Sequence, residues 1–260
     1  MTGPILEARG LTKAFGGMVA LNDLSLHIND NEILGLIGPN GSGKSTVVNL
    51  LSGVLTPTEG KVLMHGKDVT GQSAHQMARR GVSRTFQMIR LFGSLSVEDN
   101  IALALQQKEG PGYLPSFLRS GAAQRQRAQA KVRARDMLAL FDLDQKAANL
   151  AADLSIGQRR MVELARGLAT EPRIFILDEP AAGLAPQNVD RLIEMIRRMR
   201  DEFGVTILLV EHVMRVVQSV CDRVVVLDYG QKIADGPPDE VINEPQVIEA
   251  YIGLGRKTDA

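Results

Sequence analysis

The sequence predicts an α/β fold in which helices cover a mostly parallel sheet. Three runs, at residues 33–37, 174–177 and 206–210, are short and almost wholly apolar. Such runs are typical of strands that are buried on both faces. Helical patterns separate the last two runs, and a glycine-rich loop follows the first. Because an alternation of strands and helices favours parallel crossovers, these observations together indicate an α/β protein.

The N-terminal third of the chain is expected to consist mainly of strands separated by turns. Residues 5–11 and 24–28 alternate apolar and polar side chains, as half-buried strands do. Residues 61–69 are typical of a hairpin at a sheet edge, with Gly66 in its turn. The first helix is expected at 45–52, directly after the glycine-rich loop.

Two helices are expected in the middle of the chain. Residues 97–107 and 122–141 have apolar side chains at helical spacing, and glycine and proline break the pattern between them, at 106–121. The second helix has five basic residues, for which we expect a solvated helix face, with contact to a partner or a lipid headgroup as the alternative. They are Arg125, Arg127, Lys131, Arg133 and Arg135.

Helices and strands alternate after residue 158. Helices are expected at 159–169, 186–203 and 213–219, and a further strand at 223–227. Pro186 opens the second of these helices, a position that proline favours.

The composition is ordinary for a globular protein of 260 residues, with 44% hydrophobic and 23% charged residues. Thirty basic residues balance 30 acidic ones, so no overall field draws the chain to nucleic acid or acidic lipid. No signal segment is recognisable, and no apolar run approaches the ~20 residues that span a bilayer. We therefore expect a cytoplasmic protein that reaches a membrane only through partners. The single cysteine, Cys221, lies in an apolar run and is expected to be buried.

Residues 38–45 match the phosphate-loop pattern G-x-x-x-x-G-K-[ST], with an apolar run before them and a helix after them. Glycines let backbone N–H groups turn toward phosphates, and the helix adds its positive N-terminal end. Lys44 would charge-pair with the β- and γ-phosphates, and the Ser45 hydroxyl would bind Mg²⁺. ATP and Mg²⁺ are therefore the expected cofactors. The predicted nucleotide-binding residues of this loop are Gly38, Pro39, Asn40, Gly41, Ser42, Gly43, Lys44, Ser45 and Thr46.

Two carboxylates, Asp178 and Glu179, follow the apolar run at 174–177. Beside a phosphate loop, Asp178 is predicted to hold Mg²⁺, and Glu179 to orient the attacking water as general base. The alternative is an acidic strand cap. His212 follows the next apolar run and could stabilise the γ-phosphate, although a histidine at a strand end is often only a polar cap.

Residues 154–158 read Leu-Ser-Ile-Gly-Gln and open the helix at 159–169. Serine and glycine at a helix N-terminus favour anion binding. The segment is either a plain N-cap or a second phosphate site for a nucleotide held by another protomer. Physical reasoning from these residues alone favours the cap.

The order of the phosphate loop, Gln87, residues 154–158, Asp178-Glu179 and His212 resembles the nucleotide-binding subunits of ABC transporters across essentially the whole chain. The resemblance implies a P-loop NTPase core of ABC type with an antiparallel β subdomain and a helical signature subdomain. The implied division is 1–93 for the first part of the core, 94–158 for the helical subdomain, 159–240 for the second part of the core and 241–260 for a C-terminal tail.

The resemblance also implies a head-to-tail dimer with two ATP molecules at its interface. Ser155, Gly157 and Gln158 would contact the γ-phosphate of the opposite subunit. Phe15 would stack on adenine, with a core phenylalanine as the alternative. Gln87 would contact Mg²⁺ and water and respond to the membrane subunit. The implied catalytic residues are Lys44, Gln87, Glu179 and His212, and the implied metal ligands are Ser45, Gln87 and Asp178.

The chain departs from the family pattern at two positions. Ile156 stands where many members have glycine, and Ala185 replaces the usual aspartate of the dimer-contacting D-loop. The second departure bears on communication between the two ATP sites, whereas nucleotide binding is unaffected by either.

Four segments are similar to the ATP-binding subunit of branched-chain amino-acid importers: residues 84–92, the insert after Gln107, residues 179–186 and the tail at 245–253. Relatives that move urea or short amides, or that export lipopolysaccharide, share much of this pattern. The resemblance implies two transmembrane permease subunits, a second ATP-binding subunit (the same or a related chain) and, indirectly, a periplasmic binding protein. The chain would lie peripherally on the cytoplasmic face of the membrane.

Two other function classes compete with transport. A soluble ABC ATPase acting on DNA or ribosomes usually has long coiled coils or two ATPase domains with a basic linker, and this chain has neither. A non-hydrolysing regulatory subunit is disfavoured by Glu179 and His212, although Ala185 leaves it open.

Overall fold

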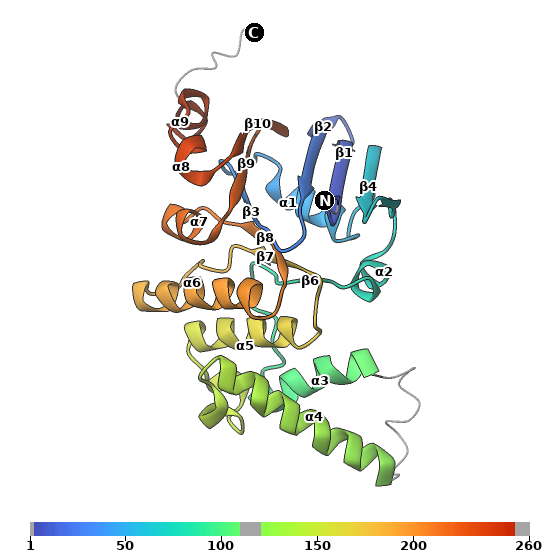
Figure 1. Ribbon diagram of the computed structural model, residues 1–260, viewed down its shortest axis with the longest axis vertical. Coiled ribbons are helices and arrows are strands. Elements are labelled where there is room, and N and C mark those ends of the chain that lie inside the picture. The colour runs from blue at the N-terminus through green and yellow to red at the C-terminus, as the bar shows by residue number, and fades with distance from the viewer. Residues whose placement is uncertain (1–2, 110–120, 253–260) are drawn as a thin grey trace.

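The computed structural model describes residues 3–109 and 121–252, which form two sheets and the helices around them (Figure 1). The larger sheet has six strands in the order β10-β9-β3-β8-β7-β6. All its neighbours are parallel except β10, which pairs antiparallel with β9. The predicted mostly parallel sheet is therefore confirmed. Its strands are β3 (Ile33–Ile37), β6 (Val82–Arg84), β7 (Ile174–Asp178), β8 (Thr206–Val210), β9 (Arg223–Asp228) and β10 (Gln231–Gly236).

The smaller sheet is antiparallel and has the order β2-β1-β4-β5. The predicted hairpin is confirmed, because Met64 pairs with Lys67 across His65 and Gly66. These two turn residues have φ values of 48° and 73°, the combination that a two-residue type I′ turn requires. The strands are β1 (Leu6–Phe15), β2 (Met18–Ile28), β4 (Glu59–Met64) and β5 (Lys67–Asp68).

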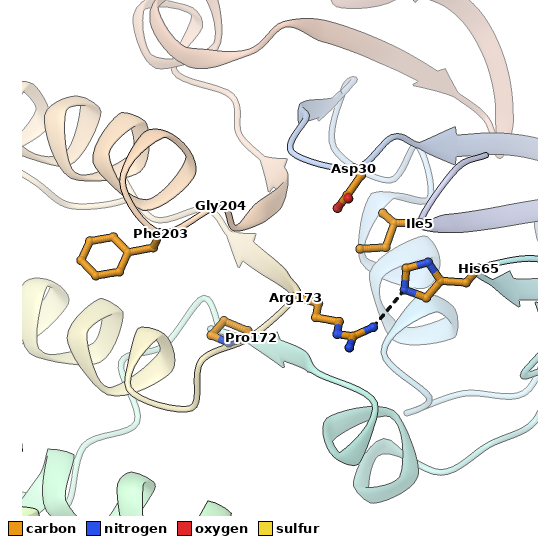
Figure 2. A pocket seen from close by; sticks show the side chains of 7 residues that line it. All are labelled: Ile5, Asp30, His65, Pro172, Arg173, Phe203 and Gly204. Carbon is orange, nitrogen blue, oxygen red and sulfur yellow. Dashed lines mark hydrogen bonds between the residues drawn. The ribbon is translucent and has the colours of Figure 1, made fainter. Parts of the chain in front are cut away.

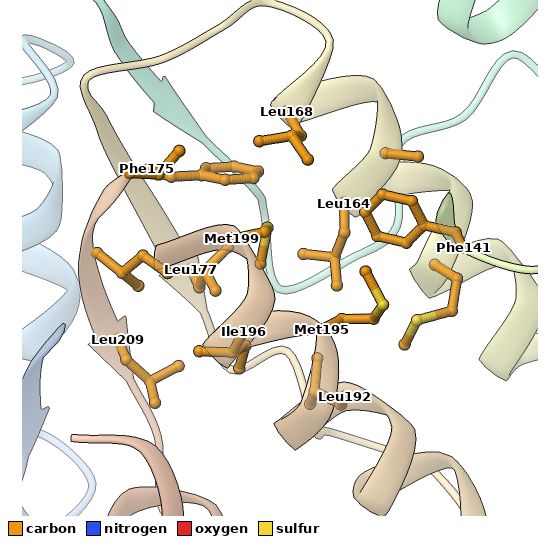
Figure 3. Close-up of a cluster of buried hydrophobic side chains, with 14 of the residues drawn as sticks. Phe141, Leu164, Leu168, Phe175, Leu177, Leu192, Met195, Ile196, Met199 and Leu209 are labelled. Atoms are coloured by element: carbon orange, nitrogen blue, oxygen red, sulfur yellow. The ribbon is translucent and has the colours of Figure 1, made fainter. Parts of the chain in front are cut away.

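Two hydrophobic cores lie on opposite faces of the six-stranded sheet. Along β7, Ile174 and Ile176 belong to the core shared with α1 (Lys44–Leu51) and the smaller sheet. Phe175 and Leu177 belong to the core shared with α5 (Ile156–Leu168) and α6 (Pro186–Asp201). This alternation explains why the strand is apolar throughout. Figure 3 shows the second core, in which Phe175 lies close to Leu168. Gly167 must be small there, because a Cβ would lie 2.1 Å from the Phe175 ring.

Figure 1 shows α5 and α6 between the larger sheet and the α3–α4 pair, whereas α1 lies beside the smaller sheet. The predicted helices are present, with α5 beginning three residues earlier than expected. Sequence analysis did not predict α2, α8, α9, β6 or β10, which are short or lie at a sheet edge. The helices are α1 (Lys44–Leu51), α2 (Ala74–Arg79), α3 (Val97–Glu109), α4 (Gly121–Leu140), α5 (Ile156–Leu168), α6 (Pro186–Asp201), α7 (Met214–Val220), α8 (Pro238–Val241) and α9 (Pro245–Ile252), with short 3₁₀ turns at Asp144–Lys146 and Ala151–Asp153.

On α4, Arg133 and Arg135 are exposed and Lys131 is half-buried, which agrees with the expected solvated face, but all three also form ion pairs. Lys131 Nζ and Arg135 Nε lie 3.0 and 2.7 Å from the two carboxylate oxygens of Glu98 on α3. Glu98 is buried, so its charge needs partners, and the basic residues supply them. Part of the basic run therefore holds α4 to α3. The predicted glycine- and proline-containing break falls mostly at 110–120, outside the described residues.

Cys221 is buried, as expected, and burial raises the pKa of its thiol well above the ordinary value. Its Sγ would lie 2.9 Å from a Cβ on Gly35, so the thiol fills the space beside a glycine of β3. Within residues 3–109 and 121–252, none of the helices combines the length and the hydropathy that crossing a bilayer requires.

Candidate functional site

The glycine-rich loop joins the end of β3 to the start of α1. Gly38, Gly41 and Gly43 have φ values of 144°, 82° and 105°, a region that side chains with a Cβ rarely adopt. At Gly38 a Cβ would lie 2.1 Å from the Leu227 carbonyl oxygen, and at Gly43 it would lie 2.7 Å from Leu21 Cδ2. The loop conformation and its close approach to β9 and β2 therefore both require glycine.

Lys44 is buried at the first position of α1, and its Nζ donates to the carbonyl oxygens of Gly38 (2.7 Å) and Pro39 (2.8 Å). Burial lowers its pKa, and the charges of Glu179 and Asp178 oppose that effect. No salt bridge to Lys44 is formed in the described part of the chain. A buried ammonium group whose neighbours are carbonyl oxygens is suited to an incoming anion.

Two further features of the loop fit a phosphate group. The N-cap of α1 is Gly43, which provides no side-chain hydrogen bond, and the first turn contains no acidic residue. Its backbone N–H groups and the positive end of the helix dipole are thus left for a ligand. Ser42 Oγ is buried without a hydrogen-bond partner among the described residues. Ser45 is exposed and Thr46 is half-buried at the same helix end.

Asp178 and Glu179 lie at the carboxyl end of β7, two strands from β3 in the same parallel sheet. The carboxyl ends of parallel strands are where open α/β sheets bind ligands. Glu179 has a φ of 48°, an uncommon value for a residue with a side chain. Its N–H donates to the Val210 carbonyl oxygen (2.9 Å), which holds this bend against the end of β8.

The predicted residues Gln87 and Glu179 are brought together, because Gln87 Nε2 donates to Glu179 Oε2 over 2.8 Å. His212 lies just beyond β8, and its side chain is 54% exposed. Three adjacent parallel strands, β6, β7 and β8, are therefore followed at their carboxyl ends by Gln87, Glu179 and His212.

Glu211, for which no role was predicted from the sequence, connects two of these segments. Its side chain is fully buried and accepts hydrogen bonds from the N–H groups of Ala181 (2.7 Å), His212 (3.0 Å) and Val213 (3.1 Å). The carboxylate thus fixes the loop after Glu179 against the loop that carries His212. Its position next to His212 was the only signal in the sequence.

Arg84 has a position in the site for which the sequence predicted no role. Arg84 is the last residue of β6, and its Nη2 lies 2.8 Å from Asp178 Oδ2. Its Nη1 donates to Asn49 Oδ1 (2.6 Å) on α1, and its guanidinium lies over the Phe86 ring. The guanidinium therefore connects α1 to the predicted magnesium ligand.

The residues present fit Mg²⁺ only together with a nucleotide. The described residues contain no group of three or more His, Cys, Asp or Glu side chains that could hold a metal ion. Mg²⁺ commonly takes one or two protein ligands and completes its shell with water and phosphate oxygens. The Ser45 hydroxyl, the Asp178 carboxylate and the Gln87 amide have the oxygen donors that such a site uses.

The segment at 154–158 forms an N-cap, as the residues alone favoured. Ser155 Oγ accepts from Gln158 N–H (3.3 Å), and Gln158 Oε1 accepts from Ser155 N–H (3.0 Å), which together make a capping box. Gly157 is buried, whereas Ser155 and Ile156 are exposed. Because α5 and α1 cover opposite faces of the sheet, the segment lies apart from the phosphate loop of its own chain (Figure 1).

Phe15 is not a core residue, so the alternative interpretation is wrong. It ends β1 and is 46% exposed. Lys13 Nζ lies over one face of its ring, 5.2 Å from the centroid. The ring is therefore accessible for stacking.

A separate cavity of about 320 Å³ lies at the other end of the parallel strands (Figure 2). Its lining residues Asp30, Arg173 and Gly204 come shortly before β3, β7 and β8, whereas the phosphate loop and Asp178 come at or after the ends of strands. Arg173 Nη1 and His65 Nε2 lie 3.5 Å apart in it. The cavity is not part of the candidate site.

Two families match the chain. The family described as "ABC transporter" matches residues 21–182, and the one described as "Branched-chain amino acid ATP-binding cassette transporter" matches residues 231–255. The chain is 40% identical to the high-affinity branched-chain amino acid transport ATP-binding protein BraF of Pseudomonas aeruginosa, over 97% of this chain and 99% of that protein. It is equally similar, with the same coverage, to the corresponding protein LivG of Escherichia coli K12.

Solved structures agree with this similarity. The ADP conformation of MJ1267, an ATP-binding cassette of an ABC transporter, has a TM-score of 0.84 and 32% identity over 97% of this chain and all of that one. The dimeric structure of the bacterial ABC transporter cassette MJ0796 has a TM-score of 0.76 and 26% identity, over 90% of this chain and 98% of that one.

Proposed function

Since this chain belongs to the ABC transporter ATPases, and among them to the branched-chain amino-acid type of ATP-binding protein, we propose that it powers the import of branched-chain amino acids by hydrolysing ATP at the site around Lys44. The observation that carries the assignment of the site is the hydrogen bond between Gln87 and Glu179 at the carboxyl end of the sheet. It holds a carboxylate at the same sheet edge as a phosphate loop. The similarity to BraF and LivG supports the substrate class.

In this proposal the chain positions ATP and moves one proton. Backbone N–H groups of the loop and the Lys44 ammonium hold the phosphates. Glu179 accepts a proton from water as the water oxygen bonds to the γ-phosphorus and the bond to the bridging oxygen of ADP breaks. Gln87 orients the carboxylate and the water, and His212 stabilises the γ-phosphate charge. Mg²⁺, held by Ser45, Asp178 and Gln87, would supply charge neutralisation at the phosphate oxygens.

We further infer that two ATP-binding subunits are needed for a complete site. Ser155, Gly157 and Gln158 lie at the N-terminus of α5, on the face of the sheet away from α1, and Ser155 is exposed there. A helix N-terminus is a ready anion site, and a second subunit would bring it to the γ-phosphate. The dimeric MJ0796 cassette supports such an arrangement. The partner is the same chain or a related one.

The permease subunits are proposed to dock where the core meets the helical region. A cleft of about 290 Å³ lies there, and its lining includes Arg84, Phe92, Asn100 and Glu163. Met88 and Phe92, 80% and 55% exposed, offer apolar surface beside it. Because Arg84 also contacts Asp178, movement in this cleft has a short path to the ATP site. The chain would then lie on the cytoplasmic face of the membrane, and a periplasmic binding protein would act through the permeases.

ATP turnover and light scattering of Glu179→Gln test the proposal. The variant should bind ATP, lose at least about a hundredfold in turnover, as expected for loss of a general base, and accumulate as an ATP-bound dimer. Glu240→Gln, which changes an exposed carboxylate on α8, serves as the matched control and should behave as the wild type. Turnover of Glu179→Gln within twofold of the wild type would exclude Glu179 as the base. Uptake of leucine by the assembled transporter, measured against urea, tests the substrate class.

A further inference from the structure

The C-terminal helix α9 returns to the first glycine of the phosphate loop. Gly38 N–H donates to the phenolic oxygen of Tyr251 over 2.8 Å, although 213 residues separate the two along the chain. Gly38 is buried, and a buried backbone N–H needs a partner. The phenol of Tyr251 provides that partner from outside the loop.

Gly38 is a position at which such a contact matters. Its φ of 144° lies in a region that residues with a Cβ rarely adopt, so the contacts around it have to hold this conformation in place. Its carbonyl oxygen accepts from Lys44 Nζ over 2.7 Å. The N–H and the carbonyl group of this one glycine are thus held by Tyr251 and by the lysine of the phosphate loop.

Helix α9 is itself anchored, so that it can hold Tyr251 in place. Val247 is 1% exposed, and Gln246 Nε2 donates to the Ile233 carbonyl oxygen of β10 over 2.8 Å. Strand β10 pairs with β9, which is adjacent to β3. Burial raises the pKa of Tyr251, against the effect of the Gly38 hydrogen bond, so the phenol stays neutral at physiological pH.

We propose that Tyr251 is a positioning residue of the nucleotide site, whose phenol fixes Gly38 and through it the carbonyl oxygens that orient Lys44. The proposal rests on the assignment of residues 38–46 as the phosphate loop. Its consequence is that the C-terminal helix, remote in sequence, is part of the ATP-binding machinery. Loss of the phenolic oxygen frees the Gly38 peptide and weakens ATP binding, while the fold remains.

The test is ATP binding by the full chain carrying Tyr251→Phe, measured by calorimetry with Mg²⁺. The ring is retained and only the hydrogen bond is lost, so we expect roughly three- to tenfold weaker binding, the range for one neutral hydrogen bond. Hydrogen exchange of the Gly38 amide, followed by NMR, should accelerate in the variant. Ile252→Ala, which changes an exposed side chain of the same helix, should leave both measurements unchanged.

Three results would overturn the proposal. They are wild-type affinity in Tyr251→Phe, unchanged exchange at Gly38, or a loss of affinity that appears only together with a lower melting temperature of the whole chain. The variant Lys44→Ala tests the phosphate-loop assignment on which this inference rests. If Lys44→Ala binds ATP as the wild type does, the phosphate-loop assignment fails, whatever Tyr251→Phe shows.

Discussion

Arg84 and Asp178 form an ion pair in which Arg84 Nη2 lies 2.8 Å from Asp178 Oδ2. Both side chains are largely buried, with 12% and 11% of their surface exposed. Asp178 is the carboxylate that we assign to Mg²⁺, so a guanidinium already satisfies part of its charge. The same guanidinium donates to Asn49 on α1, which ties the ion pair to the helix that follows the phosphate loop. The carboxylate proposed to bind Mg²⁺ is therefore held in place by a neighbouring cation.

Replacement of Arg84 by glutamine should lower the Mg²⁺ concentration needed for ATP binding. Without the guanidinium, Asp178 presents its full negative charge to the metal, and we expect the half-saturating Mg²⁺ concentration to fall by roughly two- to fivefold. Titration of a fluorescent ATP analogue with Mg²⁺ measures this. Arg80→Gln, an exposed change directly after the neighbouring α2, is the control. A higher Mg²⁺ requirement in Arg84→Gln would instead mean that Arg84 chiefly orients Asp178.

Replacement of Phe15 by alanine should weaken binding of ATP but not of inorganic tripolyphosphate. The exposed ring is placed to stack on the base, and one base–aromatic stack corresponds to roughly five- to a hundredfold in affinity. Competition against the same fluorescent analogue compares the two ligands. Met18→Ala removes an exposed side chain that pairs with Phe15 across the same hairpin, and it should change neither affinity. Equal losses for both ligands in Phe15→Ala would rule out stacking.

The helices and strands that were predicted from the sequence are those whose own residues show a clear pattern of apolar and polar side chains. The strand before the phosphate loop, the helix after it and the strand ending at Asp178 each have a pattern within a few residues, and all three are present. The antiparallel sheet and the helical region follow the family resemblance. Strand β6 has only three residues, too few for a pattern, and it is a strand because β7 pairs with it.

The contacts of Arg84 and Tyr251, which were not predicted, join segments that are distant in sequence. Arg84 meets Asp178 across 94 positions, and Tyr251 meets Gly38 across 213. Nothing in the local sequence distinguishes these side chains from others of their type. Their partners depend on the pairing of β6 with β7 and on the packing of α9 near the phosphate loop. The basic run of α4 is a similar case, since its contact with Glu98 depends on how α3 and α4 pack.

Replacement of Glu98 by glutamine should destabilise the chain at neutral pH and much less in acid. Burial would raise the pKa of Glu98, but hydrogen bonds from Arg135 and Lys131 outweigh it and lower the pKa below the ordinary 4.5. Because the pKa of Glu98 is lower in the folded chain than in the unfolded chain, its charged form stabilises the fold at pH values above the unfolded pKa. This stabilisation is lost as the pH falls through the folded pKa. Because both basic partners are well exposed, we expect a loss of only about 1 kcal/mol at pH 7.

Urea unfolding at pH 7 and at pH 4 measures this difference. The difference in unfolding free energy between Glu98→Gln and the wild type should narrow as the pH falls below 4.5, because the unfolded state is protonated before the folded one. Asp153→Asn changes an exposed carboxylate in the same region and should show no comparable loss. A gap of the same size at both pH values would mean that Glu98 acts through packing rather than through its charge.

Substitutions in the buried ion pair of Arg160 and Glu163 on α5 should distinguish its contribution to folding stability from its contribution to ATP turnover. Their side chains are each 2% exposed, and Arg160 Nη1 lies 2.7 Å from Glu163 Oε2. Arg160 also donates to the carbonyl oxygens of Phe86 (3.3 Å) and Gln87 (3.2 Å), so it holds the backbone that presents the Gln87 amide to Glu179. Burial raises the pKa of Glu163 in spite of Arg160, which indicates how poorly this site tolerates a lone carboxylate.

Arg160→Met should therefore cost about 3–5 kcal/mol of unfolding free energy, because it removes the ion-pair partner of the buried Glu163 carboxylate and leaves it the weaker contact with the Arg90 N–H (3.4 Å). The double variant Arg160→Met/Glu163→Leu removes that charge as well and should recover most of the stability. ATP turnover should stay low in the double variant, since neither new side chain can donate to Phe86 or Gln87. Denaturant unfolding measures the stability of both variants, and an ATPase assay measures their turnover. Turnover that returns together with stability would show that the pair only supports the fold, and that Arg160 does not position Gln87.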